Sequence, residues 1–127
     1  MKKLESREDI ELLVNKFYKK VVDDEVIGLF FQEIVPVNWE HHLPKMYSFW
    51  ESILFSQMTY KGNPMQKHFP INEIKALEKH HFERWLLLWR QTVEENFEGM
   101  NASLAITKSE NIANLMAYKM EIARRLS

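Results

Sequence analysis

The stretch HFERWLLLWRQTVEENF, residues 81–97, carries the clearest structural pattern of the chain. Its large apolar side chains recur every three or four residues, which places them on one face of an α-helix. Gly99 follows the stretch and is expected to end the helix. A helix with so wide an apolar face has to pack against other elements, so the stretch predicts a helical core. The residues of this face are Phe82, Trp85, Leu86, Trp89, Val93 and Phe97.

The sequence before this stretch also predicts helices. A capping-box pattern at residues 6–9 indicates the start of a first helix. Residues 24–36 are apolar without a regular period and predict short helical turns. A second helix is expected over about 40–57. Its start is placed near residue 41, so that Pro44 falls in the first turn, where its missing N–H group costs little.

Residues 58–72 are rich in Gly, Asn and Pro and predict a connector, which contains His68. A short helical piece is expected near 72–79. The last predicted helix covers about 102–126. No stretch alternates between apolar and polar residues for long enough to predict a strand. The fold class is therefore predicted to be all-α.

The composition narrows the possible functions. The length of 127 residues fits one domain, residues 1–127, and an apolar fraction of 46% is enough for a core. A net charge of −1 argues against nucleic acid or an anionic membrane as partner. The lack of Cys excludes disulfides, thiol catalysis and zinc–thiolate sites. Neither a signal peptide nor a membrane span of about 20 apolar residues is recognisable, so we expect a cytoplasmic protein.

Several enzyme classes lack their motifs. Glu78 and His81 have the Glu-x-x-His spacing of di-iron helical bundles. That chemistry needs a second such motif, and Leu43 stands where a histidine would have to follow Glu40. Neither a Gly-flanked nucleophilic serine nor a Gly-rich phosphate loop is present. The sequence therefore predicts neither a di-metal enzyme, a hydrolase nor a nucleotide enzyme.

The histidines other than His68 are sorted by helical periodicity. His42 shares a face with Met46 and other apolar residues, so it is expected to point inward, whereas His41 should point outward. Taken alone, His42 is an ordinary core histidine bonded to a backbone carbonyl. His80 is expected to face solvent, and His81 to pack at the rim of the core.

Two interpretations of the aromatic residues stay open at this point. The aromatic fraction of 13% can simply fill a helical core. Alternatively, the aromatic side chains wrap a flat apolar cofactor such as haem, whose iron needs an axial imidazole. His68 lies in a segment whose backbone could come close to a porphyrin, although a histidine in a connector is more often an ordinary polar loop residue.

A series of short motifs resembles the truncated haemoglobins, and most of all their third group. The resemblance covers residues 8–120, and the Gly-Gly pairs of the other groups are missing, as they are in the third group. The motifs are, in order, Phe17-Tyr18, Ile27-Gly28 with Phe30-Phe31, Trp39-x-x-His42, Phe49-Trp50, Gly62-x-Pro64-x-x-x-His68 and His81-Phe82-Glu83-x-Trp85-Leu86.

The resemblance implies a globin-like, two-over-two helical sandwich around one haem b. His68 matches the proximal iron ligand, and Tyr18 matches the tyrosine of the distal side. His42 matches the residue at the mouth of the distal pocket, and Trp85 the distal tryptophan of the third group.

The resemblance also implies the rest of the haem pocket. Phe31, rather than Phe30, matches the phenylalanine packed on the distal face of the porphyrin. Lys67 is the candidate partner of a haem propionate. The remaining predicted pocket residues are Met46, Trp50 and Phe82, with Trp89 near the haem or in the core behind it.

These residues predict a ligand-binding haem protein. Tyr18 and Trp85 can both donate hydrogen bonds to bound dioxygen in a dry pocket, and two such bonds would slow its release. Slow release suits nitric oxide dioxygenation or peroxide handling better than bulk oxygen transport. The expected ligands are dioxygen, nitric oxide and carbon monoxide, with an electron donor as partner. The alternatives are a haem-free globin-like sensor or interaction module, or a plain helical interaction domain.

Overall fold

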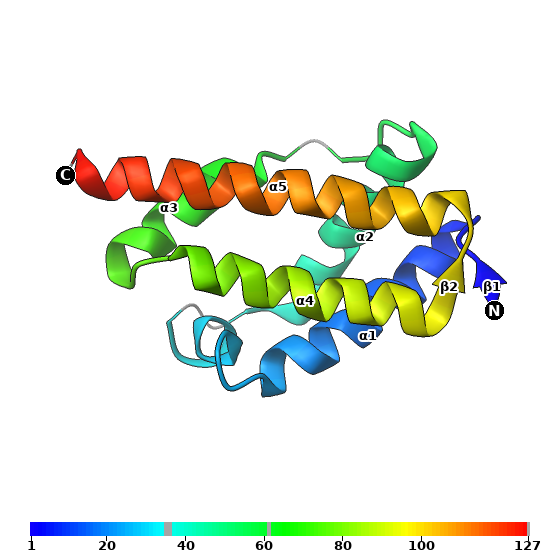
Figure 1. Cartoon of the computed structure of the whole chain (residues 1–127), viewed down its shortest axis with the longest axis horizontal. Helices are drawn as coiled ribbons and strands as arrows, with labels where there is room; N and C mark the ends of the chain where they lie inside the picture. The colour runs from blue at the N-terminus through cyan, green and yellow to red at the C-terminus, as the bar shows by residue number, and fades with distance from the viewer. Residues whose placement is uncertain (35–36, 61, 127) are drawn as a thin grey trace.

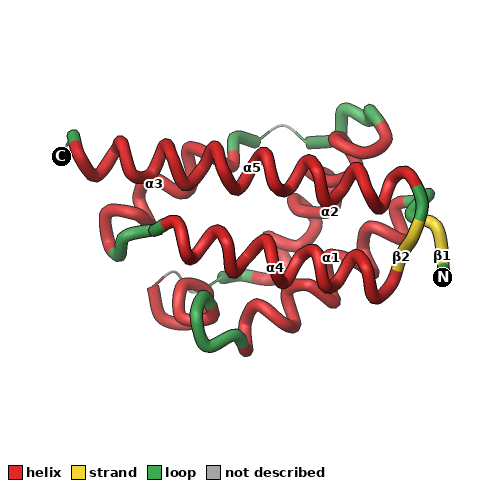
Figure 2. Tube along the Cα trace, in the orientation of Figure 1, coloured by secondary structure: helices red, strands yellow, loops and turns green. Residues whose placement is uncertain are grey.

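The computed structural model describes residues 1–34, 37–60 and 62–126, and helices dominate these ranges, as Figure 2 shows. The predicted all-α class is confirmed. No helix in the described ranges is long and apolar enough to cross a membrane. The elements are β1 (Lys2–Lys3), α1 (Arg7–Asp23), the π-helix η1 (Phe30–Ile34), α2 (Trp39–Phe55), α3 (Pro64–Ile74), α4 (Lys79–Asn96), β2 (Phe97–Glu98) and α5 (Met100–Arg125).

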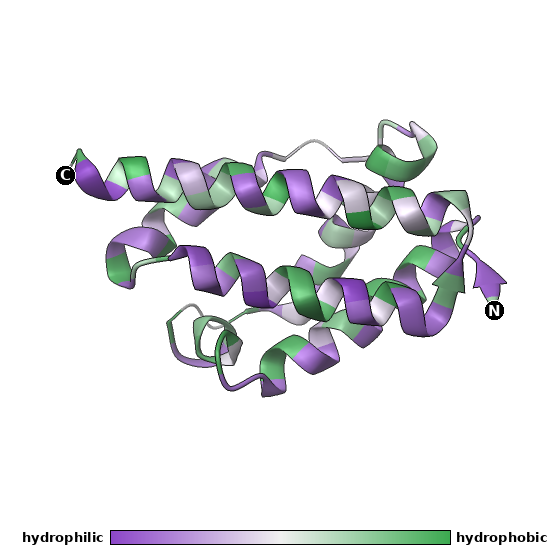
Figure 3. Ribbon diagram, viewed as in Figure 1, coloured by the Kyte–Doolittle hydropathy of each residue, from purple (hydrophilic) through white to green (hydrophobic). Residues whose placement is uncertain are grey.

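Two pairs of helices form the two layers of the fold. Helices α4 and α5 run antiparallel side by side (Figure 1), and α1 packs against both α2 and α4. Helices α2 and α3 in turn contact α5. Apolar and polar residues alternate around the helices (Figure 3), because each helix turns one face to the interior. This is the predicted two-over-two helical sandwich.

Helix α1 begins where the capping box predicts. The side chain of Ser6 accepts a hydrogen bond from the Asp9 backbone N–H at 3.2 Å, and the Asp9 carboxylate accepts one from the Ser6 N–H at 3.1 Å. These bonds satisfy backbone donors that the first helical turn leaves free. The apolar face that follows is buried: Ile10, Leu13, Val14, Phe17 and Val21.

A two-residue parallel ladder ties the N-terminus to the turn between α4 and α5. Lys2 pairs with Phe97 and Lys3 with Glu98. Gly99 follows with a φ of 99°, a left-handed conformation that favours glycine. Helix α4 already ends at Asn96, with Phe97 as its C-cap, so Gly99 does not end it as predicted but is the N-cap of α5.

Helix α2 begins earlier than predicted. It starts at Trp39 rather than near residue 41, so Pro44 lies in the second turn and not in the first. The centroid of the Trp39 ring lies 5.2 Å from that of the Tyr18 ring and 6.0 Å from that of the Phe31 ring, on which it stacks. These tertiary contacts favour a helix start at Trp39 despite the backbone donor that Pro44 lacks.

The predicted connector at 58–72 is wrong from residue 64 onward, because α3 occupies Pro64–Ile74. The helical piece expected near 72–79 is instead the end of α3, followed by a short link to α4. The Asn63 side chain caps α3, and Pro64 stands at its first position, where proline is favoured. Residue 61 of the predicted connector, and residues 35 and 36 of the predicted turns, lie outside the described residues.

Candidate functional site

A cavity of about 450 Å³ lies between the two layers and is walled mainly by aromatic and aliphatic side chains. Its volume is in the range of cofactor and small-molecule pockets, about 300–1,000 Å³. All the predicted site residues line this one cavity, although they come from five different elements. They are Tyr18, Phe31, His42, Met46, Trp50, His68, Phe82 and Trp85.

His68 lines the cavity from α3 rather than from a connector. Its Nδ1 lies 2.6 Å from the Pro64 backbone oxygen, one helical turn earlier. Because a carbonyl oxygen can only accept, Nδ1 carries the proton and the Nε2 lone pair of the neutral ring stays available. Burial lowers the pKa of His68 and outweighs the raising effect of the bond to Pro64. The side chain is therefore a neutral imidazole whose Nε2 has no hydrogen-bond partner among the described residues, the form that binds a metal ion.

Tyr18 and His42 form a polar pair in the cavity wall. The Tyr18 hydroxyl lies 3.3 Å from His42 Nε2. Burial raises the pKa of Tyr18, so the phenol keeps its proton. Burial also lowers the pKa of His42, helped by the charges of Lys67 and Lys45 and by His68. His42 points inward and His41 is exposed, as predicted, but His42 bonds to a phenol and not to a backbone carbonyl.

Three tryptophans build one wall of the cavity. Trp85 lies parallel to Trp89 with ring centroids 6.1 Å apart, and Trp89 stacks on Trp50 at 4.4 Å. The Trp89 indole N–H donates to the Ala105 carbonyl at 3.2 Å, so it serves the core. Within residues 1–34, 37–60 and 62–126, the indole N–H of Trp85 forms no hydrogen bond, which leaves this donor for a ligand.

Phe30 and Phe31 both line the cavity but lie against different neighbours. The Phe31 ring is 5.9 Å from the Tyr18 ring, beside the polar pair. The Phe30 ring is 4.9 Å from the buried His81 ring. Phe31 therefore lies on the Tyr18 side of the cavity, and Phe30 lies on the His81 side.

Two lysines lie at the cavity, of which the sequence analysis predicted Lys67 but not Lys45. Lys45 of α2 and Lys67 of α3 line it, and the close approach of the like-charged Lys67 side chain lowers the pKa of Lys45. Neither lysine pairs with a carboxylate within the described part of the chain. Two like charges without a counter-charge favour an anionic ligand group. Lys45 stands four residues after the exposed His41, and so on a polar helical face, but also one turn after His42.

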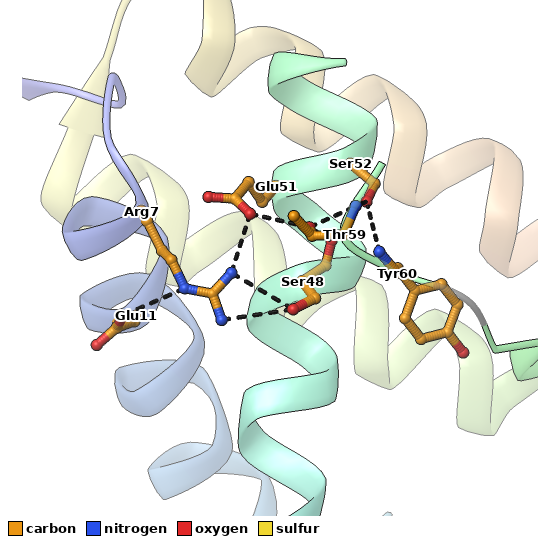
Figure 4. Close-up of polar contacts among 7 residues, drawn as sticks. All are labelled: Arg7, Glu11, Ser48, Glu51, Ser52, Thr59 and Tyr60. Carbon is orange, nitrogen blue, oxygen red and sulfur yellow. Dashed lines mark hydrogen bonds and ion pairs between the residues drawn. The ribbon is translucent and has the colours of Figure 1, made fainter. Parts of the chain in front are cut away.

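Tyr60 is a further lining residue that the sequence did not reveal. Figure 4 shows how its segment is held on α2. Arg7 Nη1 lies 2.9 Å from Glu51 Oε1, and the Thr59 hydroxyl donates to the same oxygen at 2.9 Å. The Tyr60 N–H donates to Ser52 Oγ at 3.1 Å. Because these contacts join residues 7, 51 and 59, no local pattern could predict them.

Glu78, His80 and His81 come close together at the start of α4, with candidate ligand atoms within 4.8 Å of one another. His81 Nδ1, however, accepts the Glu78 backbone N–H at 3.0 Å. This bond occupies the Nδ1 lone pair and places the proton of neutral His81 on Nε2.

Comparison with known proteins agrees with the helical fold. The family model of the bacterial-like globins matches residues 2–121. The group 3 truncated haemoglobin ctb of Campylobacter jejuni is 25% identical over 112 residues, covering 86% of this chain and 86% of the relative. A crystal structure of the group III truncated haemoglobin from Campylobacter jejuni superposes with a TM-score of 0.80 at 25% identity, covering 94% of this chain and 95% of that chain.

The resemblance to truncated haemoglobins, and to their third group, is thus confirmed, and haem binding follows from the globin family. The family match and the structural superposition both extend over nearly the whole chain. The chain therefore belongs to the bacterial-like globin family.

Proposed function

We propose that the chain binds haem b in this cavity, with His68 Nε2 as the protein ligand of the iron. The observation that carries the proposal is the hydrogen bond from His68 Nδ1 to the Pro64 oxygen, 2.6 Å long. It orients the ring and raises the basicity of the nitrogen that remains free, as partners of metal-binding histidines generally do. Haem supplies reversible binding and activation of diatomic ligands when it is bound.

The other residues of the cavity fit a porphyrin. The walls are mainly apolar and aromatic, which suits a flat macrocycle. We propose that Lys45 and Lys67 bind the propionates, because they are cationic groups at the cavity with no carboxylate partner in the described ranges. Phe31, Met46, Trp50 and Phe82 would contact the macrocycle.

On the distal side, Tyr18 and Trp85 would donate hydrogen bonds to a polar diatomic ligand. Tyr18 keeps its proton because burial raises its pKa. Trp85 offers an indole N–H that is unused within the described residues. His42, bonded to the Tyr18 hydroxyl, would orient this donor and line the ligand entrance. The proposed ligands are dioxygen, nitric oxide and carbon monoxide.

We propose that the physiological task is oxygen and nitric oxide chemistry or peroxide handling, rather than bulk transport. Two donors retain dioxygen long enough for a second reactant to meet it. Nitric oxide, dioxygen and one electron together make nitrate, so repeated turnover requires an electron donor. The test is nitrate yield after nitric oxide is mixed with the oxygenated protein. Release of dioxygen without nitrate would contradict the dioxygenase activity.

The haem site is tested by absorption spectra of the wild type, His68→Ala and His41→Ala. The spectra are recorded as isolated, after haemin, and after dithionite with carbon monoxide. We expect a Soret band that carbon monoxide sharpens in the wild type and in His41→Ala, whose histidine is exposed, and a weak band in His68→Ala. No Soret band in the wild type after haemin would favour the haem-free sensor or interaction module. Equal bands in all three proteins would remove His68 as the ligand.

A further inference from the structure

Helix α3, which carries His68, is held differently from the other helices. Of its residues Pro64–Ile74, Asn72 is the only one that is buried, and it is polar. The apolar side chains of α3 are half-buried or exposed, with Ile74 66% exposed. Met65, Phe69 and Ile71 pack against the core but are only partly buried, so apolar packing holds α3 less firmly than α1 and α4, and a polar interaction adds to it.

That interaction is a hydrogen-bond cluster around the Asn72 amide, which joins α3 to α5 and to the link before α4. Asn72 Nδ2 donates to the Met120 carbonyl at 3.0 Å. Asn72 Oδ1 accepts the Leu77 N–H at 2.9 Å and Arg124 Nη1 at 2.9 Å. The same Arg124 nitrogen donates to the Leu77 carbonyl at 2.8 Å. We call Asn72, Leu77, Met120 and Arg124 the α3 clamp.

The clamp lies one helical turn from His68. Residues four apart share one face of a helix, so Asn72 follows His68 along the side of α3 that faces the interior. Met120 and Arg124 stand one turn apart on α5, the helix that α3 contacts. Because hydrogen bonds are directional, the clamp fixes both the position of α3 along its axis and its rotation about that axis relative to α5.

We propose that Asn72 is a positioning residue, which, with Arg124 of α5, sets the position and orientation of the His68 imidazole in the cavity. This inference rests on the proposed function, in which His68 binds the haem iron. It assigns to the C-terminal helix a part in controlling the iron ligand, although α5 does not carry that ligand.

The test uses Asn72→Ala, which removes the whole amide, and Asn72→Asp, which keeps an acceptor for Leu77 and Arg124. Asn101→Ala is the matched control, because the Asn101 amide donates to the Leu4 carbonyl at 2.9 Å at the other end of α5. The first measurement is amide hydrogen exchange in the protein without haemin. The second is the resonance Raman band of the iron–histidine stretch in the reduced, haemin-loaded protein.

In Asn72→Ala we expect exchange protection of α3 to fall by at least about tenfold, while α1 and α4 keep theirs. We expect the iron–histidine band to shift or broaden in Asn72→Ala. Asn72→Asp should recover part of both properties, and Asn101→Ala should change neither. Asn72→Asp decides the question if Asn72→Ala does not fold.

Three results would overturn the inference. One is unchanged protection of α3, and another is an equal loss of protection in all helices, which indicates a general structural role. The third is a looser α3 with an unchanged iron–histidine band. Failure of the wild type to take up haemin would instead overturn the proposed function, and the exchange measurement, made without haemin, would still decide whether the clamp orders the helix of His68.

Discussion

The hydroxyl of Tyr18, which lies 3.3 Å from His42 Nε2, can be removed without changing the shape of the ring. In Tyr18→Phe we expect dioxygen to dissociate roughly 5- to 30-fold faster, because one or two kcal/mol of hydrogen-bond energy is lost. Displacement of dioxygen by carbon monoxide in a stopped-flow experiment measures this rate. Tyr118→Phe is the control, because Tyr118 is 58% exposed. Equal rates in wild type and Tyr18→Phe would remove Tyr18 as a donor.

The single residues also show what the sequence could predict. Short motifs predicted four residues that all line the cavity: Tyr18, His42, His68 and Trp85. Helical spacing also predicted that His42 points inward. Asn72 could not be found in this way. Its partners are 5, 48 and 52 residues away, and such contacts appear only after the helices have packed. Even Lys45 was missed, because a long side chain on a polar face can still reach a cavity.

The same limit applies to whole elements. Helices α1 and α4 were predicted because their apolar residues repeat at helical spacing and a cap or a glycine marks an end. Helix α3 was not, because two prolines, at 64 and 70, interrupt a segment with little amphipathic character. It forms because Asn63 caps it, because proline is tolerated at its first position, and because Asn72 bonds to α5. The first two causes were visible in the sequence, and the third was not.

The start of α1 depends on one buried carboxylate. Asp9 is 2% exposed, accepts N–H groups of Glu5 and Ser6, and lies 2.7 Å from Lys2 Nζ. Burial alone would raise the pKa of Asp9, but the bonds from Lys2, Glu5 and Ser6 lower it to about 2. The pKa of the folded protein is thus below the ordinary value of 3.8. The unfolded chain therefore binds the proton more readily than the folded protein. The ionised Asp9 carboxylate stabilises the folded protein fully above about pH 4, and this contribution is lost as the pH falls toward 2.

We therefore expect Asp9→Asn to lower the free energy of unfolding by about 1–2 kcal/mol at pH 7, and by much less near pH 2. Urea unfolding followed by circular dichroism at both pH values measures the difference. Glu11→Gln is a control on the same helix, because among the residues that the structure describes Glu11 forms only an exposed ion pair with Arg7. A difference that is the same at both pH values would show that Asp9 acts through its shape and not through its charge.

The two helical layers of the molecule leave an apolar cavity of about 450 Å³ between them. A ligand that fits the cavity and binds only the folded chain must stabilise the whole molecule through mass action. Because the lining comes from both layers, the stabilisation should extend to the entire fold.

We expect haemin at about 100 to 1,000 times its dissociation constant to raise the free energy of unfolding by about 3–4 kcal/mol. The effect should be much smaller for His68→Ala, which keeps the cavity but loses the iron ligand, and unchanged for His41→Ala, whose side chain is exposed. Urea unfolding monitored by far-ultraviolet circular dichroism, with and without haemin, measures all three proteins. An equal gain in wild type and His68→Ala would mean that the apolar walls hold the macrocycle without help from His68. No gain in any of them would mean that the cavity serves a different ligand.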